Sequence, residues 1–160
     1  MQNTSLAPKK MNWHMILIYG LLWLMAFMSL LNGLIGVFGV QVAPTADGGM
    51  GIALHVYPDM AHPRLFILDG VFSLIMSMYT VFVRFQLSGF KRRGPMYLTV
   101  MFGLNIAESV VYAVILYQLI PELAEMVGTL GQTLSVTLSA TVAAILSHIY
   151  YLRRSELFVN

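Results

Sequence analysis

Residues 95–120 read PMYLTVMFGLNIAESVVYAVILYQLI, and this stretch contains a single charged side chain, Glu108. A helix of roughly 20 apolar residues crosses a bilayer core that is about 30 Å thick. The stretch is long enough for that. Gly94 and Pro95 suit the first turn of a helix, because the N–H that proline lacks would have no partner there. These features predict a transmembrane helix.

Three further apolar stretches, at about 13–40, 65–87 and 128–152, meet the same length requirement. The whole chain is 58% hydrophobic and 10% charged, whereas soluble domains are about 45–50% apolar and about 25% charged. A soluble fold of 160 residues could not bury so much apolar surface. We therefore predict an all-α integral membrane protein, a four-helix up-down bundle that forms one transmembrane domain over residues 1–160.

The basic residues predict how the bundle is oriented. Eight of the nine lie before the first helix, around the connection between the second and third helices, or after the fourth; Arg64 alone lies on the opposite side. Positively charged loops stay in the cytoplasm. We therefore expect cytoplasmic N- and C-termini, an inner (plasma) membrane location, and an irregular outer loop at 41–64.

The composition argues against several classes of function. The net charge of +2 is small and the basic residues are not grouped on one face, so nucleic acid is not an expected partner. Cysteine is absent, which rules out disulfides and thiolate metal sites. The sequence also lacks a glycine-rich phosphate loop, a His-Glu-x-x-His motif and a Gly-x-Ser-x-Gly motif. We therefore expect neither catalysis nor a cofactor.

Polar side chains inside the apolar stretches are the candidates for function, because ionisable groups are costly in a bilayer. Glu108 lies about 16 Å deep by residue count, close to the midplane. In the second helix, five polar residues at spacings of three and four share one face: Asp69, Ser73, Ser77, Thr80 and Arg84. With side chains of the other helices they could enclose a polar seam that binds a cation or relays protons. The candidate residues of this seam are Asn32, Asp69, Arg84, Glu108, Tyr112, Gln132, Ser139 and His148.

The same residues also have a purely structural interpretation. Ser, Thr and Asn side chains often join membrane helices by hydrogen bonds. A buried carboxyl group can stay neutral and hydrogen-bond to a neighbour, for Glu108 a residue such as Ser139. For Asp69 the expected neighbours are Asn32, Gln132 or Thr133. Both interpretations stay open at this point.

The outer loop contains a possible metal site. His55, Asp59 and His62 supply two imidazoles and a carboxylate, which suit zinc, and Met50 and Met60 nearby would favour copper. The alternative is an ordinary solvated loop, because the three residues show no repeated ligand spacing.

Several short motifs mark the second half of the chain. The second helix has an early acidic residue, Asp69, and a basic turn, Lys91-Arg92-Arg93, follows it. The third helix begins with Pro95-Met96-Tyr97, contains Asn105 and ends at Ile120-Pro121. The fourth helix ends with Tyr150-Tyr151-Leu152-Arg153-Arg154-Ser155. Through these motifs, residues of about 63–158 resemble an uncharacterised family of small bacterial four-helix inner-membrane proteins, a domain of unknown function. The resemblance implies a four-span topology and no known activity.

Three classes of function remain. The first is a non-catalytic accessory or assembly subunit that packs in the lipid bilayer against a partner membrane protein or against its own copies. The second is a small oligomeric transporter or channel component that uses the seam around Asp69 and Glu108. The third, a membrane enzyme, is the least supported, because no nucleophile and base can be paired. We predict the first.

Overall fold

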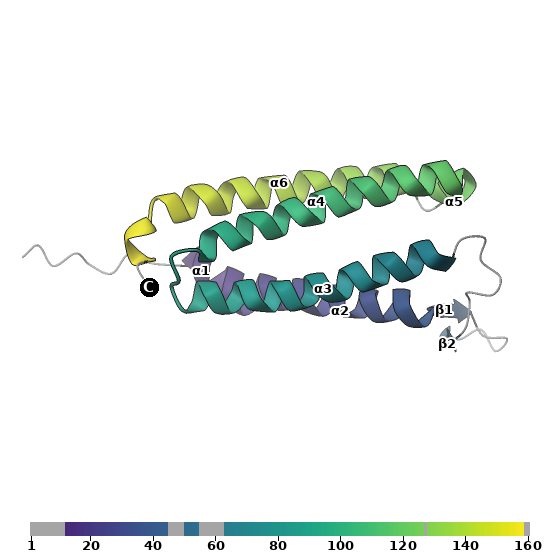
Figure 1. Ribbon diagram of the computed structural model, residues 1–160, viewed down its shortest axis with the longest axis horizontal. Coiled ribbons are helices and arrows are strands. Elements are labelled where there is room, and N and C mark those ends of the chain that lie inside the picture. The colour runs from purple at the N-terminus through teal and green to yellow at the C-terminus, as the bar shows by residue number, and fades with distance from the viewer. Residues whose placement is uncertain (1–11, 45–49, 55–62, 127, 159–160) are drawn as a thin grey trace, which may run out of the picture.

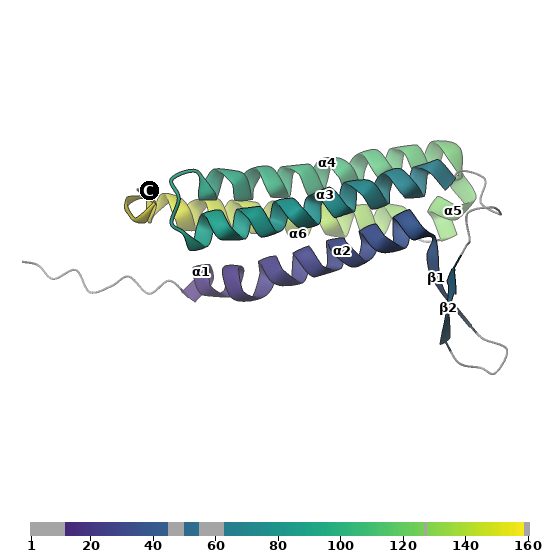
Figure 2. The ribbon, with the colours of Figure 1, turned by 60° about the horizontal axis from the view of Figure 1, so that its bottom comes forward.

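The computed structural model describes residues 12–44, 50–54, 63–126 and 128–158. Four helices in this part of the chain are long and apolar enough to cross a membrane, and they lie side by side (Figures 1 and 2). They are the first helix, made of α1 (Asn12–Ile16), the π-helical turn η1 (Leu17–Leu21) and α2 (Leu22–Phe38), then α3 (Pro63–Ser88), α4 (Gly94–Leu119) and α6 (Thr129–Leu152). Each begins and ends within two residues of its predicted bounds.

Glycine and proline delimit the helices. α2 ends where Gly39 adopts a left-handed conformation, with φ of 64°, and its N–H donates to the carbonyl oxygen of Ile35. Pro95 lies in the first turn of α4, where the absent N–H is tolerated. Pro121 follows the end of α4 and begins the short helix α5 (Pro121–Met126). After α6 the chain makes the 3₁₀ turn η3 (Ser155–Leu157).

The connection between α2 and α3 is more regular than predicted. Its described part contains two strands, β1 (Val40–Pro44) and β2 (Met50–Leu54), which pair antiparallel with Val40 opposite Leu54. Val40, Val42 and Ile52 are β-branched, which favours this extended backbone over an irregular loop. Figure 2 shows the hairpin projecting away from the helices.

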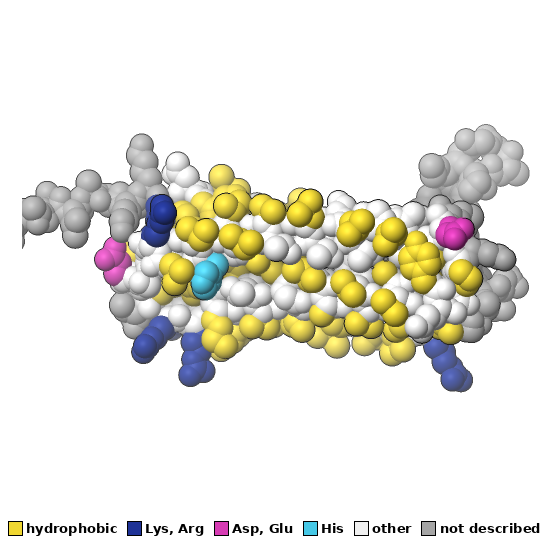
Figure 3. All heavy atoms as spheres, turned by 90° about the horizontal axis from the view of Figure 1, so that it is seen from above, with side chains coloured by type: hydrophobic (Ala, Val, Ile, Leu, Met, Phe, Trp, Pro, Cys, Tyr) yellow, Lys and Arg dark blue, Asp and Glu magenta, His cyan; other side chains and the backbone are white. Residues whose placement is uncertain are grey.

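The two ends of the bundle differ in charge. We call the end that holds Lys91, Arg92 and Arg93, in the turn between α3 and α4, the basic end, and the end with β1 and β2 the hairpin end. The described chain starts and finishes at the basic end (Figure 1). Figure 3 shows apolar side chains along the length of one face and most basic side chains gathered near that end. This pattern matches helices whose long sides face an apolar solvent.

The most extensive helix contact joins α2 to α3, and the next most extensive joins α4 to α6. Gly36 and Gly70 lie against each other, so a Cβ built on Gly36 would come within 2.6 Å of the Cα of Gly70. Small residues at this contact allow the two backbones to touch, as they do where membrane helices pack. The molecule is therefore built from two helix pairs.

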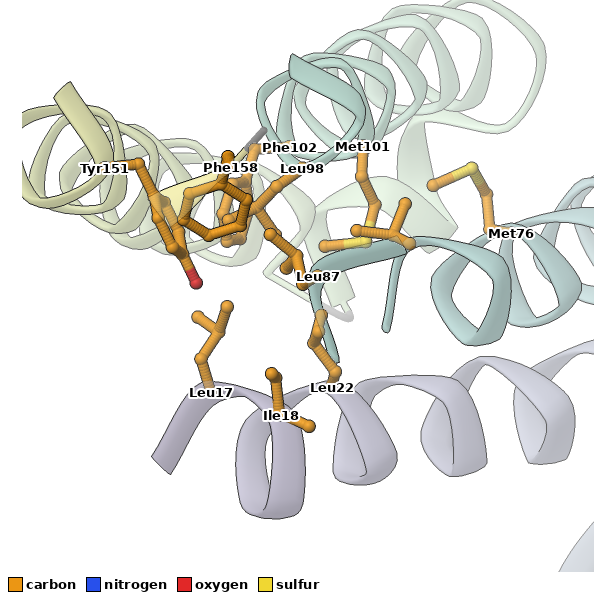
Figure 4. Close-up of a cluster of buried hydrophobic side chains, with 11 residues drawn as sticks. Leu17, Ile18, Leu22, Met76, Leu87, Leu98, Met101, Phe102, Tyr151 and Phe158 are labelled. Carbon is orange, nitrogen blue, oxygen red and sulfur yellow. The ribbon is translucent and has the colours of Figure 1, made fainter. Parts of the chain in front are cut away.

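One apolar cluster joins the two pairs, and it lies toward the basic end (Figure 4). Its buried members come from the start of the first helix, the second half of α3, the start of α4, the end of α6 and the residue after η3: Leu17, Ile18, Leu22, Met76, Val83, Leu87, Leu98, Met101, Phe102, Tyr151 and Phe158. Toward the hairpin end, the contact between α3 and α4 is lined partly by polar groups instead. That region contains the candidate site.

Candidate functional site

Asp69 lies in α3, half-buried, and is held from α2. The side-chain amide of Asn32 donates to the Asp69 carboxyl at 3.4 Å and to the hydroxyl of Ser73 at 2.9 Å. The prediction that Asp69 lies within reach of Asn32 is confirmed. The amide thus ties the two helices together near the place where Gly36 and Gly70 bring them into contact.

Glu108 reaches Asp69 from α4. The two carboxyl groups hydrogen-bond to each other, so they join one helix pair to the other. Tyr112, one turn further along α4, lies close enough to interact electrostatically with both. Asn32, Asp69, Glu108 and Tyr112 are therefore brought together, as the seam hypothesis expects of these four.

Residue counts predict a depth of roughly 6–8 Å for Asp69, compared with about 16 Å for Glu108, which separates the two acids. α3 begins at Pro63, two residues earlier than predicted, so Asp69 lies about 9 Å along the helix from its start, since each helical residue rises about 1.5 Å. The contact between the two acids therefore follows from how α3 and α4 pack, which residue counts from the helix ends do not show.

A cavity of about 340 Å³ opens beside the carboxyl pair, between α3 and α4. Asp69, Glu108 and Tyr112 contribute its polar groups. The rest of its lining is apolar: Leu65, Leu68, Phe72, Leu104, Ala107, Val111 and Ile115. The paired acids therefore border a hydrophobic pocket.

The chemistry of the pair follows from its hydrogen bond. An ionised carboxylate can only accept, so a hydrogen bond between two carboxyl groups requires a proton on one of them. Two negative charges at this distance would also repel each other in an apolar setting. The arrangement can therefore hold one proton between Asp69 and Glu108.

Arg84 does not belong to this group. Its guanidinium lies over the ring of Trp23 at 4.7 Å and beside Phe85 at 5.2 Å, on the side of α3 that faces α2. Aromatic faces attract a cation without a carboxylate. Arg84 therefore contacts aromatic rings and not the predicted seam.

The candidate residues of α6 also lie elsewhere, because this helix turns another face inward. Ala140, Ala143 and Ala144 pack against the apolar cluster, while Gln132, Ser139 and His148 are exposed. The expected bond between Ser139 and Glu108 is wrong: the Ser139 hydroxyl donates to the carbonyl oxygen of Val136 in its own helix, at 3.1 Å. Because the backbone satisfies this hydroxyl, nothing requires it to face the interior.

The other polar residues of α3 act structurally. The hydroxyl of Ser77 donates to the carbonyl oxygen of Ala26 in α2, at 2.8 Å, and Thr80 donates to Met76 in its own helix, at 2.7 Å. Both are buried. The interpretation of this hydroxyl face as helix-joining is confirmed for Ser77.

Sequence reasoning missed a polar contact at the basic end. The Nδ1 of His14 and the hydroxyl of Tyr151 lie 2.9 Å apart, both residues being buried, and the imidazole stacks on Phe90. The first helix is thereby joined to the end of α6. A histidine near a predicted helix start was visible in the sequence, but nothing in its spacing indicates Tyr151 as its partner.

The three residues of the predicted metal site, His55, Asp59 and His62, lie outside the residues that the structure describes. The zinc or copper hypothesis therefore stays a prediction.

The chain matches no protein-family model, and no curated protein or solved structure is significantly similar to it. The resemblance to small four-helix inner-membrane proteins stays a prediction. The functional argument therefore rests on the geometry of this chain alone.

Proposed function

We propose that the chain is a multi-pass protein of a bacterial inner membrane, with both termini in the cytoplasm, and that it is a non-catalytic module packed against partner membrane helices. Its four helices, each long and apolar enough to span a membrane, support the first part. The observation that carries the second part is the uncovered outer face of α6.

This face is lined by small residues. Gly131, Ser135 and Ser139 follow each other at four-residue spacing, and all three are exposed. A Cβ added at Gly131 would meet nothing within 4 Å. Small residues at this spacing let membrane helices approach closely, and α2 and α3 of this chain use Gly36 and Gly70 in that way.

α6 is also the least covered of the long helices. Within its most apolar 18 residues, 6% are buried, compared with 33% for α3. A helix that only anchored the bundle would need no row of small residues on its outer side. The row supports a role in packing against another helix, either of a partner protein or of a second copy.

Two matched glycine substitutions test this proposal. Gly131 in α6 and Gly103 in α4 are both exposed, and neither has an atom within 4 Å of an added Cβ. Both Gly131→Leu and Gly103→Leu should therefore leave the fold intact, as judged by circular dichroism in mild detergent. Only Gly131→Leu should lose the proteins that copurify with the wild type.

The same variants distinguish a partner protein from a second copy. Copies that carry two different tags will pull each other down if the face joins identical chains. If Gly131→Leu and Gly103→Leu retain the same associations as the wild type, the outer face of α6 is not the interface and the proposal fails.

The proposed orientation has its own test. At the basic end lie Lys91, Arg92, Arg93, Arg153 and Arg154, whereas Arg64 is at the start of α3. A reporter fused after Asn160 should be active in the cytoplasm, and a tag inserted near Gly49 should be reached from outside the cell. An externally labelled C-terminus would reverse the orientation.

The carboxyl pair favours a second candidate function, a small oligomeric transporter or channel component. Asp69 and Glu108 hydrogen-bond beside a cavity between α3 and α4, and the pair can exchange its proton for a cation. Such a role requires one of the two groups to lose and regain a charge. A structural role requires only the hydrogen bond.

Glu108→Gln separates the two roles, because glutamine keeps the hydrogen-bonding shape but cannot ionise. If the pair is structural, the variant should fold and copurify with the same partners as the wild type. If the pair is functional, cation- or proton-driven uptake into proteoliposomes will disappear in the variant. Glu125→Gln, at an exposed position in α5, is the control and should behave as the wild type in both assays.

A further inference from the structure

A second cavity lies at the basic end of the bundle, away from the carboxyl pair. It has a volume of about 680 Å³ and lies between the start of α4 and the end of α6. Arg92, His148 and Ser155 contribute polar groups to its lining, and Met96, Leu152 and Phe158 contribute apolar ones. Its chemistry is therefore divided between a basic part and a hydrophobic part.

The basic groups of this cavity have no partner among the residues that the structure describes. Arg92 is exposed in the turn before α4, and it has no ion pair with any residue that the structure describes. His148 is exposed too and has no hydrogen bond in the described ranges. Glu156, the acidic side chain of this end, does not line the cavity. Two basic side chains in one cavity, neither of them paired with a described residue, favour an anionic ligand.

The two basic groups lie at different levels along the helices. Arg92 precedes the first residue of α4, whereas His148 lies one helical turn before the last residue of α6, Leu152. One turn corresponds to about 5.4 Å along the axis. The imidazole therefore lies deeper than the guanidinium, on a helix surface whose neighbouring exposed residues are mostly apolar.

The apolar wall shows to which side the cavity opens. Met96 and Leu152 are each 61% exposed, so the wall faces outward and not into the bundle. A ligand in this cavity would contact Arg92 and His148 at its polar end and the outer apolar surface along its length. A free inorganic anion uses only the first of these features, whereas an anionic lipid uses both.

We propose that this cavity binds an anionic phospholipid, with its headgroup phosphate on Arg92 and His148 and an acyl chain along Met96 and Leu152. Arginine pairs with phosphate through two parallel hydrogen bonds, and basic pockets between membrane helices on the cytoplasmic side bind anionic headgroups. The inference rests on the membrane insertion and orientation proposed above. It assigns the lipid to the leaflet that meets the basic end.

Native mass spectrometry of the full chain in mild detergent tests the proposal. The probes are dioleoylphosphatidylglycerol, dioleoylphosphatidylcholine and inorganic phosphate, titrated separately. We expect the wild type to retain phosphatidylglycerol in preference to phosphatidylcholine, and inorganic phosphate to compete poorly. Arg92→Gln should weaken phosphatidylglycerol binding about tenfold, because it removes a charge-assisted hydrogen bond.

Arg93→Gln is the matched control. It removes the same charge from the same turn, but Arg93 does not line this cavity. His148→Gln is a second, independent variant and should weaken the same binding. Circular dichroism of each variant will show that the fold is retained.

Three results would overturn the proposal: equal binding of the two lipids, equal losses in Arg92→Gln and Arg93→Gln, or inorganic phosphate that displaces the lipid at matched concentration. The first two would leave only non-specific charge attraction, and the third would indicate a soluble anion. Because this assay is carried out in detergent, its failure is distinct from a failure of the topology test, which reports insertion and orientation in cells.

Discussion

The contact between α2 and α3 leads to a sharp prediction about Gly70→Ala. A Cβ at this position would lie 2.7 Å from the carbonyl carbon of Gly36 and 2.7 Å from the backbone nitrogen of Val37. Both atoms belong to the backbone of α2, so no side-chain rotation can relieve the overlap. The two helices must move apart or turn.

The size of the required movement follows from those distances. Ordinary contact begins at 3.4 Å, so the helices must separate by about 0.7 Å at this point. Forcing extra atoms into a tightly packed interface typically costs about 1–3 kcal/mol. Alanine also favours a helix over glycine by up to about 1 kcal/mol, which partly hides the cost in a single measurement.

Gly103→Ala removes that ambiguity. Gly103 lies in the middle of α4, and an added Cβ there meets nothing within 4 Å. It should therefore show the gain in helix propensity without the clash. We expect Gly70→Ala to be less stable than Gly103→Ala by about 1–3 kcal/mol, measured as the free energy of unfolding in mixed micelles by titration with a denaturing detergent.

The opposite result is easily recognised. If the two alanine variants unfold at the same free energy, then α2 and α3 do not touch through their backbones. The description of the molecule as two tight helix pairs would then be wrong for the first pair.

Three further predictions concern the basic end and the outer loop. Tyr151→Phe removes the hydroxyl that lies 2.9 Å from Nδ1 of His14. It should lower the free energy of unfolding by about 1–3 kcal/mol, because a buried ring nitrogen loses its partner. An unchanged free energy of unfolding would refute this pairing. Leu87→Ala, at a fully buried side chain, should destabilise the fold by about 2–5 kcal/mol, whereas Leu138→Ala, 68% exposed, should have little effect in the same titration. If the outer loop binds zinc or copper, either metal should raise the melting temperature of the wild type but not of His62→Ala, and no shift in the wild type would exclude the site.

The four long helices were predictable because their signal is local. Each is a run of apolar residues longer than a bilayer requires, and proline or glycine at Gly39, Pro95 and Pro121 marks where helices begin or end. An even number of antiparallel helices also places the start and the finish of the described chain at one end. None of these conclusions depends on which helix faces meet.

The hairpin could be predicted only in part. Val40, Val42 and Ile52 favour extended backbone, but strand pairing joins residues across a turn, and their register is not evident from composition. The surrounding glycines and prolines suggested an irregular loop. The pairing of Val40 with Leu54 is a property of the folded chain.

The candidate site shows most clearly where local reasoning ends. Asp69 and Glu108 were identified as costly polar groups, and Asn32 as a partner, because buried polar groups need neighbours. That the two acids hydrogen-bond to each other depends on how α3 and α4 meet. That Ser139 and His148 are exposed depends on how α6 is rotated about its axis. A serine can satisfy its hydroxyl within its own helix, as Ser139 does through Val136. Polarity therefore does not indicate which face turns inward, and the packing of the small side chains of α6 against the core sets that rotation instead.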